Sequence, residues 1–282
     1  MANRSPLVRD ALRRAPWAMA WLGTLAVAAV LAPVLAPFDP VAQPDIIADA
    51  ARPPSAVHWM GTDLLSRDVF SRVVYGARVS LGIGLAGGGL AALLGAAVGL
   101  LAGSSARWVD AVLMRIVDVG LSVPRVVVLL AISAAWGALS PLGLVAVLVA
   151  TGWFGVAKLV RADTRALRTE DWIVAARALG VPPSRVLWRH LWPAVLPNVL
   201  IAATLGVGHT IAIEAALSFL GLGIQPPTPS WGTMLADAAE RPLETWWLLA
   251  APGLALASTA LACSAAADAL RTPREAGEVA VA

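Results

Sequence analysis

Charged side chains are scarce in this sequence. Of its 282 residues, 14% are charged and 59% are hydrophobic, and the mean hydropathy is +0.75. A soluble domain of this length carries roughly 25% charged residues and about half apolar ones. The deficit excludes an ordinary soluble domain and predicts a polytopic membrane protein.

Residues that build disulfides and metal sites are also few. The single cysteine, Cys263, allows neither an internal disulfide nor a Cys-rich metal site. Three histidines are expected in an outer loop, an inner loop and a span, so we do not expect them to share a metal: His58, His190 and His209.

Catalytic motifs are missing as well. The sequence contains no H-E-x-x-H, no G-x-S-x-G and no G-x4-G-K-[ST] phosphate loop. Its only lysine, Lys158, stands in V-A-K-L without the glycines that cradle phosphate. We therefore expect neither enzyme activity, nor an ATPase site, nor a bound cofactor. Energy for any uphill transport must come from another chain or from an ion gradient.

Long apolar runs are abundant, and six of them reach the roughly 20 residues that a helix needs to cross a bilayer. They cover residues 17–38, 79–103, 113–137, 141–160, 196–216 and 246–267. The expected fold class is an all-α polytopic membrane protein with six transmembrane helices. Only residues 138–140 separate the third run from the fourth, which suits an antiparallel helix pair.

Arginine and lysine gather on one side of these spans. With the N-terminus in the cytoplasm, fifteen of the 21 fall on the cytoplasmic side and five outside, and Arg125 falls within the third span. The positive-inside rule therefore predicts that both termini are cytoplasmic. The expected order is a cytoplasmic segment (1–16), the first span with an extracytoplasmic loop (17–78), a core (79–268) with a cytoplasmic loop (161–195), and a cytoplasmic tail (269–282).

Small and aromatic residues mark helix packing and membrane interfaces. Glycines at four-residue spacing let helix backbones approach closely in lipid, so a packing face is expected on the second span at Gly84, Gly88, Gly95, Gly99 and Gly103. Interfacial anchors near span ends are expected at Trp17, Trp21, Trp108, Trp136, Trp246 and Trp247.

Three ionisable residues lie in or near the predicted membrane region: Asp118, Arg125 and Glu214. A charge at the bilayer centre costs about 2.5–3.5 kcal/mol, so each is expected to face protein or water. Asp118 and Arg125 are seven residues apart, two helical turns along one face, which favours a shared polar seam. Two interpretations stay open: contact between helices, or the lining of a substrate path with Glu214 as the best single candidate.

The cytoplasmic loop contains the polar stretch VAARALGVPPSRVLWRHLWP, residues 174–193. Thr169 is a predicted N-cap, and Trp172, Ala176 and Leu179 follow the i, i+4, i+7 spacing of an apolar helix face. Gly180 is predicted to end this helix in the left-handed conformation.

A second short helix is predicted after the turn. Ser184 is its expected cap, the helix covers about 185–192, and Pro193 is expected to close it. The apolar face of the first helix either lies on the membrane surface or docks into a groove of a partner. The residues alone leave both readings open.

This loop resembles the pattern E-A-A-x3-G-x9-I-x-L-P of ABC importer inner-membrane permeases. Positions that match are Ala175, Ala176, Gly180 and Pro193, while Val174 replaces the glutamate and His190 and Trp192 replace the isoleucine and leucine. Other stretches are similar to the second permease of the pair in the dipeptide/oligopeptide/nickel group: HWMGTDLLSRDVFSRVVYGARVSLGIG (58–84), MRIVDVGLSVP (114–124), RHLWP and EAALSFLGLGIQPPTPSWGTML (214–235). The resemblance covers roughly residues 17–275.

The resemblance implies a type I ABC importer permease fold in the bacterial inner membrane. The cargo would be peptides or a related small solute, nickel chelates included. Implied partners are a homologous permease, two cytoplasmic ATPase subunits that bind the ATP, and an extracytoplasmic solute-binding protein; no nucleic acid is expected. The outer loops 39–78 and 217–245 would form a docking face and gate. Loop residues expected to couple to the ATPase are Trp172, Ala175, Ala176, Gly180, Arg185, His190 and Pro193.

An ion-driven secondary carrier is the alternative. Such carriers need ionisable ligands near the membrane midplane and broken helices in matching halves. Asp118 and Glu214 fit this requirement poorly, because no internal repeat is visible. The identity of the solute stays open.

Overall fold

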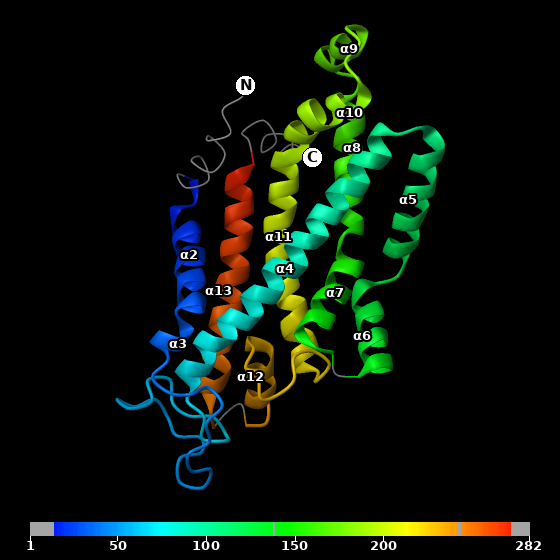
Figure 1. Ribbon diagram of the computed structural model, residues 1–282. Coiled ribbons are helices and arrows are strands. Elements are labelled where there is room, and N and C mark those ends of the chain that lie inside the picture. The colour runs from blue at the N-terminus through cyan, green and yellow to red at the C-terminus, as the bar shows by residue number, and fades with distance from the viewer. Residues whose placement is uncertain (1–13, 138, 242–243, 272–282) are drawn as a thin grey trace.

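Helices run lengthwise between two ends of an elongated bundle (Figure 1). The structure is a computed structural model and describes residues 14–137, 139–241 and 244–271. One end carries the short helix α9 (Asp171–Ala178) and the other carries α12 (Trp231–Ala238). We call them the α9 end and the α12 end. The described chain starts and finishes at the α9 end, where the Arg14 guanidinium donates to the Arg271 carbonyl oxygen over 2.5 Å.

Each predicted span corresponds to one helix or to a pair of consecutive helices. In chain order these are α2 (Pro16–Val30) with α3 (Ala32–Leu35), α4 (Val69–Ser104), α5 (Arg107–Ser122) with α6 (Arg125–Trp136), α7 (Pro141–Gly152) with α8 (Phe154–Leu167), α11 (Trp192–Phe219) and α13 (Trp246–Leu270). Three helical stretches are long and apolar enough to cross a membrane alone, and two bent pairs qualify jointly. The described residues contain no β-strand, as the all-α prediction requires.

Two predicted spans are each divided into two helices by a bend. α5 and α6 meet at 78° across residues 123–124, and α7 and α8 meet at 41° across Trp153. Pro124 explains the first break, because it has no amide hydrogen and disfavours a helical conformation at the residue before it. The second break has no such sequence marker.

The helix that contains the second predicted span begins before that span. α4 starts at Val69 rather than at residue 79, since the Asp68 carboxylate accepts a hydrogen bond from the Ser71 amide over 2.8 Å and caps the helix. The last ten residues of the predicted loop 39–78 are therefore helical.

The glycines of α4 permit close packing, as predicted. α4 crosses the bundle obliquely and lies against α11 and α8 (Figure 1). A Cβ on Gly88 would lie 2.6 Å from the backbone nitrogen of Val207 in α11, and one on Gly99 would lie 2.6 Å from the carbonyl oxygen of Ala157 in α8. Both distances are far inside van der Waals contact, so α4 contacts its neighbours backbone to backbone along this face.

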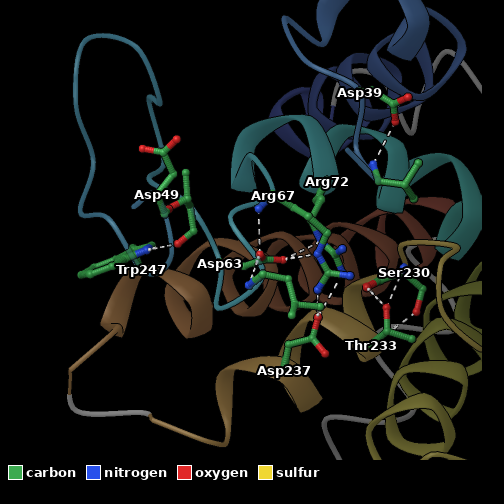
Figure 2. Close-up of polar contacts among 12 residues, drawn as sticks. Asp39, Asp49, Asp63, Arg67, Arg72, Ser230, Thr233, Asp237 and Trp247 are labelled. Carbon is green, nitrogen blue, oxygen red and sulfur yellow. Dashed lines mark hydrogen bonds and ion pairs between the residues drawn. The ribbon is translucent and has the colours of Figure 1, made fainter. Parts of the chain in front are cut away.

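A buried network of charges organises the α12 end (Figure 2). The Arg67 guanidinium lies 2.6 Å from Asp63 and 2.8 Å from Asp237 of α12, and the Arg72 guanidinium lies 3.1 Å from Asp237. Asp63, Arg67 and Arg72 are buried. The network fastens the loop before α4 to α12.

Two tryptophans complete this end. Trp231 starts α12, is fully buried, and donates its indole hydrogen to the Val73 carbonyl oxygen over 3.1 Å. Trp247, predicted as an interfacial anchor, is buried instead and donates to the Thr62 carbonyl oxygen over 3.2 Å. That prediction is wrong because the indole has a polar partner within the protein.

Candidate functional site

The predicted coupling loop forms a protruding helix with a tight turn at the α9 end (Figure 1). Gly180 has φ +77°, the left-handed conformation that the sequence predicts. Its amide donates to the Arg177 carbonyl oxygen over 2.9 Å, and the Val181 amide donates to the Ala176 carbonyl oxygen over 3.1 Å. These two bonds define a Schellman motif, which ends α9 sharply.

The start of α9 differs from the prediction. The N-cap is Glu170, not Thr169, and the Glu170 carbonyl oxygen accepts from the Ile173 amide over 2.9 Å. The Thr169 hydroxyl donates backwards to the Ala166 carbonyl oxygen over 2.8 Å. Thr169 therefore helps to close the turn after α8 instead of opening α9.

The second loop helix does not stop at Pro193. α10 (Pro183–Val186) continues through a π-helical turn, η1 (Leu187–Leu191), directly into α11. Ser184 lies inside α10, whose N-cap is Pro182. Within η1 the Trp192 amide donates to the Leu187 carbonyl oxygen, five residues back. Pro193, which has no amide hydrogen to donate, follows this π-helical turn within the continuous helical stretch.

Ile173 anchors α9 to the membrane-spanning helices. Its side chain is fully buried in a cluster with Leu100 of α4, Val160 of α8 and Val195 of α11. α9 itself packs mainly against α10, and Val186 of α10 and Leu191 of η1 belong to the same close-packed cluster. The sequence analysis missed Ile173, because periodicity shows which residues share a helix face but not which face points inward.

Three large apolar side chains of α9 and its C-cap are exposed around the buried Ile173. Trp172 is 43% exposed and Leu179 is 84% exposed. Val174, which stands where the family pattern has glutamate, is 51% exposed. The Trp172 ring packs near the His190 ring of η1, with 6.2 Å between centroids. Two predicted coupling residues thus lie together beside an unpartnered apolar surface.

The remaining predicted coupling residues lie on and beside this surface. Ala175 is exposed and Ala176 half-buried within α9. Arg185 and Pro193 line a shallow groove of about 440 Å³ on α10 and η1, together with Trp188 and Arg189. The loop therefore presents an apolar knob, formed by Trp172 and Leu179, and a basic groove that contains Arg185 and Arg189.

Positive charge borders the base of α9. The Arg168 guanidinium donates to the Gly103 carbonyl oxygen at the end of α4 over 2.8 Å. Burial, together with the nearby charges of Arg177 and Arg165, lowers the pKa of the Arg168 guanidinium, which still remains protonated at neutral pH.

Asp118 and Arg125 do not form the polar seam that their spacing favours. The bend between α5 and α6 removes the common helix face. Asp118 pairs with Lys158 of α8 over 2.7 Å, at a half-exposed position. The Asp110 carboxylate pairs with Arg161 and Arg165 on the same helices, so ion pairs join α5 to α8.

Arg125 points toward α7. Its Nε donates to the Thr151 hydroxyl over 3.2 Å and its Nη2 donates to the Leu148 carbonyl oxygen over 2.8 Å. The guanidinium lines a small cavity near the middle of the bundle, together with His209 of α11. The sequence analysis gave His209 no role.

Glu214 is fully buried between helices. It accepts hydrogen bonds from the Ser218 hydroxyl over 2.8 Å and from the Ser80 hydroxyl of α4 over 3.0 Å. The Ser80 oxygen in turn accepts from the Trp231 amide over 3.3 Å. Glu214 therefore joins α11, α4 and α12, which favours the helix-contact interpretation of this residue.

The chain is similar to known transport permeases over most of its length. The family described as "Binding-protein-dependent transport system inner membrane component" matches residues 95–272. The dipeptide transport system permease protein DppC of Alkalihalophilus pseudofirmus is 40% identical over 219 residues, which cover 77% of this chain and 71% of the relative. DppC of Bacillus subtilis is 36% identical over 88% of this chain and 77% of its own. The glutathione transport system permease protein GsiD of Pectobacterium atrosepticum is 35% identical over 94% of this chain and 93% of its own. The chain therefore belongs to the binding-protein-dependent transport system inner membrane component family, as a multi-pass inner-membrane permease of an ABC importer.

Proposed function

We propose that this permease translocates peptides or related small solutes and that α9 is the helix that couples it to two cytoplasmic ATPase subunits. The names of its relatives support the substrate class, since they include dipeptide and glutathione permeases. In this proposal the chain holds no nucleotide and performs no chemistry of its own.

One observation carries the coupling role: α9 is anchored by a single buried side chain, while large apolar side chains around it are exposed. Ile173 is buried among helices of the core, whereas Trp172 and Leu179 are exposed. An exposed apolar knob on a rigid support suits a groove in another protein. When the ATPases close on ATP, a knob seated in them would carry α9 along and tilt α4, α8 and α11 between inward-facing and outward-facing arrangements.

We further propose six spans with both termini in the cytoplasm, so that the α9 end is cytoplasmic. The concentration of Lys and Arg in the loops at that end supports this orientation. The α12 end would then meet an extracytoplasmic solute-binding protein, and a homologous permease would complete the pathway. The network that includes Arg67 and Asp237 would hold the outer docking face rigid.

An ion-driven carrier is the competing function. The two broken spans would suit one, but they are consecutive in the chain rather than in matching halves. Membership of the family favours the ATP-driven importer.

Co-purification and ATP depletion test this proposal. We expect ATPase subunits to co-purify with the tagged permease from cells that express the whole transporter, and uptake of labelled dipeptide to stop when ATP is depleted. If uptake continues at the same rate after ATP depletion and no ATPase co-purifies, the protein is the ion-driven carrier instead.

A variant of α9 tests the coupling role. Trp172→Asp with Leu179→Asp is expected to reduce the co-purified ATPase at least about tenfold, since a buried interfacial charge costs more than 1.4 kcal/mol. Both side chains are exposed, so the protein should stay folded in the membrane. Ile47→Asp, at a 96% exposed position near the α12 end, is the matched control and should retain the ATPase. Equal ATPase recovery from both variants would contradict the assignment of α9.

A further inference from the structure

The two broken spans meet at one polar cavity. Arg125 follows the break between α5 and α6, and Gly152 precedes the break between α7 and α8. Both line a cavity of about 60 Å³, whose wall also contains Gly88, Gly206, His209 and Thr210. Two interruptions of helical backbone therefore surround the same small space.

The cavity lies at membrane depth. Gly88 is near the middle of α4, which has 36 residues, and Gly206 is at the middle of α11, which has 28. Non-helical backbone at this depth occurs where protein covers it or where it lines a water-filled cavity. His209 is exposed on α11, so the cavity opens to the surface of the subunit.

Arg125 is held in place with donors to spare. Its two protein acceptors, the Thr151 hydroxyl and the Leu148 carbonyl oxygen, are neutral. Within the described residues, no carboxylate lies within ion-pair distance of this guanidinium. A guanidinium has five N–H donors. A permanent charge within a span is costly unless it meets a partner or water, and here the partner is missing from the subunit.

We infer that Arg125 and His209 form a carboxylate-binding subsite on the translocation path, which takes the free C-terminal carboxylate of a transported peptide. The inference rests on the proposed function. A guanidinium matches the two oxygens of a carboxylate in geometry as well as in charge. The cavity, of about 60 Å³, has room for a carboxylate group. The glycines on its wall leave the space open and contribute no charge of their own.

Direct binding to the complete transporter tests this subsite. The purified complex of both permeases and both ATPases, in lipid nanodiscs without the binding protein, is mixed with radiolabelled alanyl-alanine. Unlabelled alanyl-alanine and its C-terminal amide then compete for the site. We expect the free acid to compete at least about tenfold better than the amide, since hydrogen bonds to charged groups contribute about 1.5–3 kcal/mol.

Variants separate the subsite from assembly. Arg125→Gln is expected to weaken binding of the free acid about tenfold and to leave binding of the amide unchanged. Arg125→Lys keeps the positive charge and should recover part of the lost affinity. His209→Ala should weaken the free acid to a smaller extent. Arg115→Gln removes an arginine from the same bent span but away from the cavity, and it should bind as the unchanged protein does.

Several outcomes would overturn the inference. The first is that the free acid and the amide displace labelled alanyl-alanine equally well. The second is that the transporter binds no measurable alanyl-alanine. The third is that Arg125→Gln and Arg115→Gln lose equal affinity for the free acid. Loss of the partner permease from the purified Arg125→Gln complex would instead identify a carboxylate of that permease as the partner of Arg125. The proposed function fails separately, if the unchanged transporter imports neither dipeptide nor glutathione with ATP.

Discussion

Arg67 and Asp237 lie 170 residues apart in the chain and form an ion pair, with 2.8 Å between Nη2 and Oδ2. Arg67 precedes α4 and Asp237 lies in α12, so this contact joins the segment before α4 to the segment between α11 and α13. Asp63 and Arg72 complete the cluster (Figure 2). Charges buried in this way stabilise the protein only while the set is complete.

Arg67→Leu is therefore expected to lower the free energy of unfolding by about 3 kcal/mol, because Asp63 and Asp237 lose a cation while they remain partly or fully buried. Thermal unfolding in detergent measures the change. The control, Arg241→Leu, removes a 63% exposed arginine that lies 4.0 Å from Glu244 and should cost less than about 1 kcal/mol. Similar losses in both variants would mean that the buried cluster adds no stability.

Gly88→Ala is expected to destabilise the bundle by about 1–3 kcal/mol. The added methyl group would meet the backbone of α11 at 2.6 Å, and backbone cannot move aside as a flexible side chain can. Gly89 is its matched control, because a Cβ there has nothing within 4 Å. Gly89→Ala should be neutral or stabilise by up to about 1 kcal/mol through helix propensity. Equal effects in a detergent unfolding assay would contradict backbone contact between α4 and α11.

Substitutions of Gly180 are expected to separate conformation from size. A Cβ at this position has nothing within 4 Å, so any loss must come from the backbone. Gly180→Pro cannot adopt φ +77° and removes the amide that donates to Arg177, so ATP-dependent uptake should be abolished. Gly180→Asn tolerates the left-handed conformation and should keep most of the uptake. Normal uptake by the proline variant would exclude the turn from coupling.

Glu214 is expected to tolerate glutamine but not leucine. Glu214→Gln keeps one acceptor oxygen for the Ser80 and Ser218 hydroxyls, so the complex should still assemble. Glu214→Leu removes both acceptors and should cost about 1–3 kcal/mol of stability. Unfolding and co-purification of the partner permease are the measurements. Full assembly and uptake in Glu214→Gln would assign the residue to helix contact rather than to the solute path.

Several features of the fold follow from local sequence. Apolar runs predict the helix positions because about 20 consecutive apolar residues are enough for a helix to cross the bilayer, whatever the rest of the fold. Gly180 ends α9 because a positive φ is a property of a single residue and its immediate hydrogen bonds. The glycines of α4 likewise predicted close packing from their spacing alone, but the sequence did not show that α11 and α8 are the neighbouring helices.

Other features depend on contacts between distant residues. Periodicity grouped Trp172, Ala176 and Leu179 on one face of α9, but only the burial of Ile173 in the cluster beneath α9 decides which side of the helix points inward. Spacing likewise put Asp118 and Arg125 together, and the break at Pro124 parts them.

By itself, then, the sequence determined the class of the protein, the approximate positions of its apolar helices and the turn at Gly180, because each of these depends on residues close together in the chain. Only the tertiary structure decided that Arg67 finds Asp237, that Glu214 lies among serines, and that Arg125 shares a cavity with His209. Most of these contacts join segments far apart in sequence, such as the one between Glu214 and Ser80 of α4. Their partners are selected by how the helices pack, which no local pattern encodes.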